Sequence, residues 1–157
     1  RLSRVSERVR AVLTVVMFEA EPIHHEAFAL DPDSYGPDLA ELLARGPVSA
    51  VEVETARVVV ASAVSELHEA FSELDLVMSA TVPIVAPRIG ELHVTVHGHA
   101  HPVELLLTRL TSLANAAGLP AVSMPAPGER SLPVGVQFVG RSGEEGTLLS
   151  IADLLLD

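Results

Sequence analysis

The chain has 157 residues, a length that fits one domain of ordinary size. It carries a formal net charge of −11, and such an acidic surface repels phosphate backbones, so nucleic acid is not an expected partner. The chain has no cysteine, which excludes a disulfide framework, a thiol nucleophile and a cysteine-based zinc site. We expect a cytoplasmic protein without a membrane partner, because no apolar run reaches the roughly 20 residues that span a bilayer.

The first part of the chain predicts helices. Apolar side chains recur at helical spacing over residues 4–29 and again over residues 50–73. Ser49 and Glu52 are spaced as a capping box at the start of the second stretch, where each side chain can accept a backbone N–H of the other residue. Residues 1–73 are therefore expected to be mainly helical.

Residues 74–157 instead predict a mixture of strands and helices. Short apolar runs predict buried strands at 76–78, 121–124 and 134–139, and alternation predicts a strand at 92–96 that turns back as a hairpin. Helices are predicted over 105–117 and, behind a second capping box at 142–145, from there to the end of the chain. This alternation indicates an α/β fold with a mostly parallel or mixed sheet.

The predicted hairpin carries a cluster of four histidines: His93, His97, His99 and His101. On a fully extended strand, alternate histidines would share one face at a spacing that metal sites use. Gly98 and Pro102 favour a turn instead, and Glu91 and Glu104 are the nearby carboxylates. Two interpretations stay open: an exposed hairpin tip without a ligand, and a metal-binding hairpin. No metal ligand is assigned on this basis, and no cofactor is expected.

Ser123 is a weak candidate for a catalytic nucleophile. A triad with a histidine and Asp75 is conceivable, but the residues around Ser123 lack the Gly-x-Ser-x-Gly elbow that exposes such a serine. We expect Ser123 and Met124 to fill a strand in the core.

Three segments carry a resemblance to a known family. The first is Asp75-Leu76 followed by Thr81-Val82-Pro83, the second is LTSLANAAGLPAVSMP at residues 110–125, and the third is LPVGVQFVG at residues 132–140. In this order they resemble the C-terminal half of the amidase signature family. The resemblance implies that residues 1–157 are a C-terminal fragment of a single amidase-signature domain, whose mixed β-sheet core is flanked by helices.

The resemblance also implies a chemistry that this chain cannot perform alone. Family members hydrolyse amides with a serine nucleophile, a second serine in a cis peptide and a lysine base, through an acyl-enzyme. All ten Lys or Arg positions here are arginine, and no Gly/Ser-rich nucleophile stretch is present. No catalytic residue is therefore assigned, and this chain alone is expected to be inactive.

Partners and channel residues follow from the same resemblance. It implies a missing N-terminal amidase half, in the same chain or a separate one, together with a small amide substrate, and it is compatible with a homodimer. Thr81 and Asn115 lie in the first two matching segments and are the candidates for the substrate channel, where their side chains could hydrogen-bond substrate; the alternative is that they order a loop. The alternative is a non-enzymatic remnant, or a partner- or metal-binding module that uses the hairpin from His93 to His101.

Overall fold

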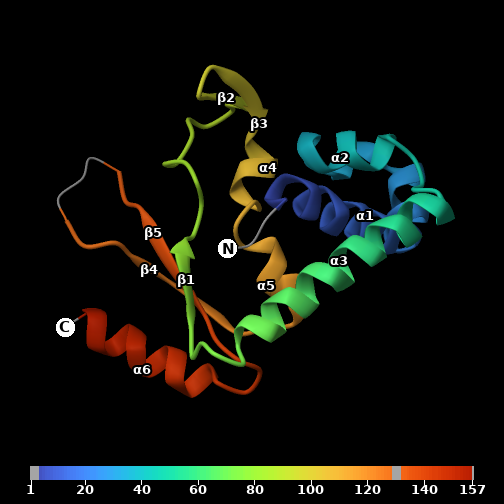
Figure 1. Ribbon diagram of the computed structural model, residues 1–157. Helices are drawn as coiled ribbons and strands as arrows, with labels where there is room; N and C mark the ends of the chain where they lie inside the picture. The colour runs from blue at the N-terminus through green and yellow to red at the C-terminus, as the bar shows by residue number, and fades with distance from the viewer. Residues whose placement is uncertain (1–3, 129–131, 157) are drawn as a thin grey trace.

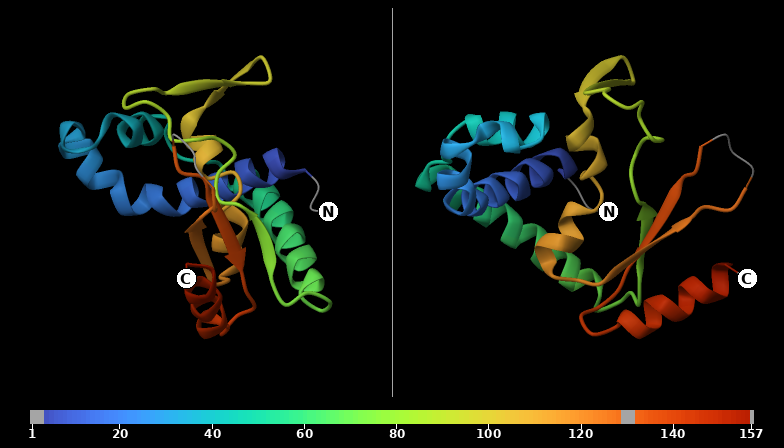
Figure 2. Two further views of the ribbon diagram at one scale, coloured as in Figure 1. Left: turned by 90° about the vertical axis from the view of Figure 1, so that its left-hand side faces the viewer. Right: turned by 180° about the vertical axis from the view of Figure 1, so that it is seen from behind.

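A computed structural model describes residues 4–128 and 132–156. Figures 1 and 2 show a helical part that lies to one side of a small sheet, with a further helix on the sheet's far side. The elements in chain order are α1 (Val5–Leu30), the short 3₁₀ turn η1 (Pro32–Ser34), α2 (Pro37–Ala44), α3 (Ala50–Ala70), β1 (Val77–Ala80), β2 (His93–Val96), β3 (His99–Pro102), α4 (Val103–Leu107), α5 (Ser112–Ala117), β4 (Ala121–Pro125), β5 (Gly135–Val139) and α6 (Glu145–Leu156).

The two long helices form where the apolar spacing predicts them, and α1 and α3 lie against each other (Figure 1). The capping box at the start of α3 is present: the Ser49 hydroxyl accepts the Glu52 N–H at 3.2 Å, and Glu52 Oε2 accepts the Ser49 N–H at 3.0 Å. Arg8 of α1 is buried and donates to Glu66 of α3 at 2.6 Å. These contacts fix α3, which leads directly into the sheet.

The main sheet has the strand order β1-β5-β4, and a separate two-stranded sheet pairs β2 with β3. The central strand β5 runs antiparallel to both neighbours, with Val139 opposite Val77 on one side and Ala121 on the other. The predicted α/β class is confirmed. A mostly parallel or mixed sheet was expected, and the described strands pair antiparallel throughout. In the main sheet, β5 returns along β4 after a loop, which favours antiparallel pairing.

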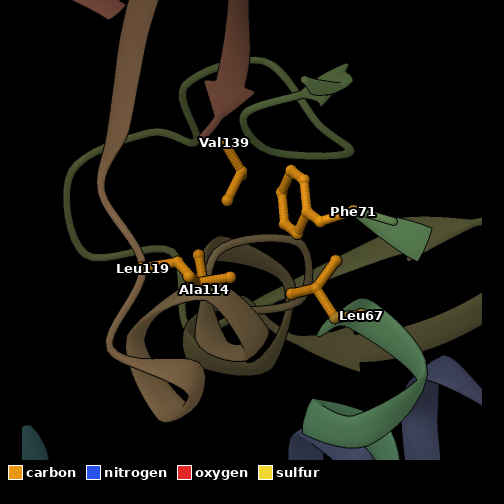
Figure 3. Close-up of a cluster of buried hydrophobic side chains, with 5 residues drawn as sticks. All are labelled: Leu67, Phe71, Ala114, Leu119 and Val139. Carbon is orange, nitrogen blue, oxygen red and sulfur yellow. The ribbon is translucent and has the colours of Figure 1, made fainter. Parts of the chain in front are cut away.

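A small apolar core lies between α3, α5 and one end of this sheet (Figure 3). Its five buried side chains are Leu67, Phe71, Ala114, Leu119 and Val139. Helix α6 covers the opposite face of the sheet, where Met124, Leu148 and Ala152 are buried. Arg141, which follows β5, connects the sheet to the end of α3, since its guanidinium donates to the carbonyl oxygens of Phe71 and Leu74 at 3.1 and 3.0 Å.

Two predicted helices have different bounds in the structure. The helix expected over 105–117 is broken into α4 and α5 by a turn over 108–111. At the end of α4 the Glu104 carbonyl accepts both the N–H of Thr108 at 3.2 Å and its hydroxyl at 2.9 Å. The last helix begins at Glu145 rather than at the predicted Ser142. Gly143 has a φ of +83°, so the chain turns before the helix starts, and Glu144 accepts the Thr147 hydroxyl at 2.6 Å.

The predicted hairpin is confirmed. Strands β2 and β3 pair antiparallel around His97 and Gly98, whose φ angles are +50° and +81°, the two positive values that a tight type I′ turn needs. Within the described ranges, no helix is both long enough and apolar enough to cross a membrane.

Candidate functional site

Polar side chains form a row across one face of the main sheet. Ser79 of β1, Gln137 of β5 and Ser123 of β4 are cross-strand partners, so they share a face. Gln137 is only 3% exposed, and its Nε2 donates to Ser79 Oγ at 2.9 Å and to the Leu110 carbonyl at 2.7 Å. The amide of Gln137 therefore connects the β1 edge of the sheet to the turn between α4 and α5.

Thr81 and Ser123 come together at the end of this row. Their hydroxyl oxygens lie 2.6 Å apart, and the Thr81 N–H donates to the Gly135 carbonyl at 2.9 Å. Ser123 is exposed and Thr81 is half-buried, so the hydroxyl pair lies at the surface. Because each hydroxyl can both donate and accept, the pair keeps hydrogen-bonding capacity for a further group.

Gly135 leaves the space that this pair occupies. A Cβ on Gly135 would lie 2.6 Å from Thr81 Oγ1 and 3.2 Å from Ser123 Oγ, and the first of these distances is closer than such atoms can approach. A glycine inside a strand indicates a close approach by another group. At Gly135 the approaching groups are the side chains of Thr81 and Ser123.

Asn115, the second predicted channel residue, lies elsewhere. It is exposed on α5, and its backbone takes part in the helix, with the Gly118 N–H donating to its carbonyl at 3.1 Å. Helix α5 packs at the Val139 end of the sheet, whereas Thr81 is held at the Gly135 end. The structure thus separates Thr81 from Asn115, and no hydrogen bond joins them in the described part of the chain.

Ser123 was the residue that sequence reasoning misplaced. It is exposed next to Thr81, whereas Met124, the next residue on the strand, is buried on the other face. The conceivable triad partner Asp75 contacts Arg141, with 3.2 Å between Oδ1 and Nη2. The strand alternation that separates Ser123 from Met124 was visible in the sequence, but it did not reveal which face was covered.

The histidine hairpin does not form the predicted metal-binding alternative. His97 lies in the turn, and the cross-strand register places His99 and His101 on one face and His93 on the other. Over residues 4–128 and 132–156, no group of three or more histidine, aspartate or glutamate side chains could hold a metal ion. The turn at His97 and Gly98 prevents the extended conformation that the alternative required.

Two carboxyl groups at the long helices accept hydrogen bonds that lower their pKa values. The hydrogen bond from the Arg8 guanidinium lowers the pKa of the Glu66 carboxyl, and the Ser49 hydroxyl and N–H together lower the pKa of Glu52. Both carboxyls are therefore held as carboxylates by hydrogen bonds. These are contacts that stabilise helices, and neither carboxyl lies in the row of Ser79, Gln137 and Ser123.

The three motif segments lie within an α/β fold, and together they supply the hydroxyl pair and Gly135. The family model described as Amidase matches residues 38–149, which is most of the chain. The chain belongs to the amidase family.

Known relatives agree with this assignment. The chain is similar to the A subunit of glutamyl-tRNA(Gln) amidotransferase from Halobacterium salinarum, at 39% identity over 88 residues that cover 55% of this chain and 19% of that protein. The corresponding protein of Thermotoga maritima is 38% identical over 88 residues, covering 55% of this chain and 17% of the relative. The matched residues of the chain therefore span less than a fifth of the length of these relatives.

Solved structures extend the similarity to almost the whole chain. A crystal structure of an amidase superposes with a TM-score of 0.82 at 27% identity, over 94% of this chain and 35% of that one. A structure described as a vestigial protein complex that reveals the origins of an s-triazine catabolic enzyme gives a TM-score of 0.83 at 26% identity, over 97% of this chain and 34% of that one. The 157 residues therefore correspond to about a third of an amidase chain.

Proposed function

We propose that this chain is the C-terminal part of one amidase-signature domain and that the whole domain hydrolyses a small carboxamide. The observation that carries the proposal is the superposition of 94% of the chain on only 35% of an amidase, in a sequence without lysine. A serine–serine–lysine mechanism then requires residues from outside these 157, in the same polypeptide or in a partner chain.

The distribution of apolar side chains supports a core that other sequence completes. No large side chain among the described residues is fully buried. Several large apolar side chains that follow α3 are well exposed, including Met78 at 66%, Ile89 at 107% and Leu92 at 64%. Exposed apolar surface of this kind marks an interface with another part of a protein.

Within this proposal, Thr81 and Ser123 line the substrate channel. Their hydroxyls are within hydrogen-bonding distance of each other and open to solvent, and a carboxamide offers both a donor and an acceptor to such a pair. Asn115 lines a separate part of the channel wall, because α5 lies at the other end of the sheet. Neither Thr81 nor Asn115 is assigned to the chemical step.

Ammonia release from a panel of primary carboxamides tests the proposal. The intact mass of the denatured protein first establishes whether the sample contains polypeptide beyond this chain. A protein that also contains the part of the domain with the catalytic serines and lysine is expected to release ammonia. The 157 residues alone are expected to release none. Hydrolysis by the 157 residues alone, or no hydrolysis of any amide by the complete protein, would contradict the proposal.

A further inference from the structure

Two adjoining hollows lie beside the N-terminal turns of α1. The first is a cavity of about 200 Å³ between α1, α3, α5 and the sheet. Its walls are chiefly apolar and include Val5, Val9, Leu67, Leu113, Ala114 and Val139. The second hollow, of about 100 Å³, lies between α1, β3 and α4. Val9 and Arg109 line both hollows, so the two share a wall.

The second hollow is basic in a strongly acidic chain. Arg10, Arg109, His101 and the hydroxyl-bearing Ser6 line it, and among residues 4–128 and 132–156 no aspartate or glutamate does. No salt bridge joins either arginine to a carboxylate in the same part of the chain. The chain has a net charge of −11, so carboxylates outnumber basic side chains, and yet none of them pairs with the arginines of this hollow in the described structure.

Arg8 does not provide this charge. Arg8 lines the apolar cavity, but its guanidinium is paired with Glu66 at 2.6 Å, which neutralises it locally. The excess positive charge therefore lies on the side of Arg109, at the wall between the two hollows. Arg109 is half-buried, so water screens its charge less than it screens a fully exposed arginine.

We propose that the two hollows form one binding site for a small organic carboxylate. The apolar body of the ligand occupies the cavity beside Val139, and its carboxylate lies between Arg109 and Arg10, where Ser6 and His101 offer further donors. Guanidinium groups bind carboxylates through charge-assisted hydrogen bonds. A cavity of about 150 Å³ lined by aliphatic side chains accepts benzene, so about 200 Å³ accommodates a phenyl ring or a branched chain of similar size.

An inorganic anion would use only half of this site, because it would leave the apolar cavity empty. A neutral apolar molecule would leave the basic hollow without a counter-charge. The adjoining geometry therefore selects a ligand that has both features. The inference concerns equilibrium binding and does not rest on the proposed amidase function.

Isothermal titration calorimetry of the intact protein with 3-phenylpropanoate tests the site. The neutral 3-phenylpropan-1-ol and the short anion acetate separate the contributions of the carboxylate and of the apolar body. We expect 3-phenylpropanoate to bind at least about tenfold more tightly than either, since each comparison removes one full set of contacts. Arg109→Gln and the exposed Arg10→Gln should each weaken it by about tenfold or more.

Arg88→Gln is the matched control, because Arg88 lines neither hollow. It should leave the dissociation constant unchanged. Equal binding of the acid and the alcohol, or wild-type affinity in the Arg109→Gln variant, would overturn the proposal. Absence of 3-phenylpropanoate binding to the wild type would overturn it as well.

Discussion

The two ends of the main sheet differ in how much of their surroundings this chain supplies. At the Val139 end, α3 and α5 bury a compact apolar cluster, and Arg141 ties the layers together. At the Gly135 end, Thr81 and Ser123 face solvent. The Val139 end thus holds a buried apolar cluster that this chain builds by itself, whereas the Gly135 end is a polar surface of the kind expected next to a binding channel.

The two ends of the sheet fit the proposal that the chain is one part of an amidase domain whose catalytic residues lie outside these 157. The Val139 end is built from segments of this chain alone, and Leu67, Phe71 and Val139 meet there in one cluster (Figure 3). The Gly135 end carries the hydroxyls of Thr81 and Ser123 beside a glycine, and these groups can position a ligand but cannot supply a base. The following predictions test this difference, from the largest expected effect to the smallest.

Removing the largest side chain of the apolar cluster at the Val139 end should have the largest effect on stability. Phe71→Ala deletes a ring that is 6% exposed, and such truncations lower the free energy of unfolding by about 3–5 kcal/mol. Urea denaturation followed by circular dichroism measures the loss. Met78→Ala, at a side chain that is 66% exposed, is the control and should change stability little. A loss from Phe71→Ala no larger than that from Met78→Ala would show that the cluster is not the core.

Filling the space beside the hydroxyl pair should have the next largest effect. Gly135→Ala places a Cβ within 2.6 Å of Thr81 Oγ1, so Thr81 must move, and overpacking of this kind costs about 1–3 kcal/mol of unfolding free energy. Gly146→Ala in α6 is the matched control, since its Cβ meets nothing within 4 Å and alanine favours a helix. In thermal melts, Gly135→Ala should have a lower melting temperature than the wild type and Gly146→Ala a higher one. Equal melting temperatures for both variants would contradict the geometry around Gly135.

The cap of α3 should contribute less than either core position. Ser49→Ala removes the acceptor of the Glu52 N–H and should cost about 1 kcal/mol, measured by urea denaturation at neutral pH. The lowered pKa of Glu52 means that its contribution is complete above the unfolded-state pKa of a glutamate and is lost as pH falls through the lowered folded-state pKa. The difference between Ser49→Ala and wild type should therefore shrink in acid. A difference that grows in acid would contradict this sign.

Breaking the hydroxyl pair should have the smallest effect on stability. Thr81→Val keeps the shape and removes a hydrogen bond at the surface, so the unfolding free energy should fall by less than about 1 kcal/mol. If the complete protein is an amidase, the same variant should raise KM for its amide while Thr55→Val, on the exposed face of α3, leaves KM unchanged. An equal KM for Thr81→Val and the wild type would show that the Thr81 hydroxyl does not bind substrate in the channel.

The sequence predicted the elements better than it predicted their surroundings. Apolar spacing and the Ser49 cap located α1 and α3 to within a few residues, because helix signals are local. Gly98 and its neighbours also located the hairpin. The break at Thr108 was missed, because the apolar spacing continues through residues 105–117 and residues 108–111 include no glycine or proline.

The site was less accessible to prediction because it depends on contacts between distant segments. Thr81 and Ser123 are 42 positions apart, and only the strand order β1-β5-β4 brings their hydroxyls to 2.6 Å. A glycine in a strand, such as Gly135, indicates that another group comes close, but the sequence does not identify which residues make that contact. Asn115 was grouped with Thr81 by motif, and the structure separates them along the sheet.

The state of the purified 157-residue chain tests the central claim most directly. Light scattering behind a sizing column, together with binding of a hydrophobic dye, reports whether part of the core is missing. If other sequence completes this fold, the chain should self-associate and bind the dye, because side chains such as Met78 and Leu92 are exposed. A monodisperse monomer that binds no dye and melts in one cooperative transition would contradict the account.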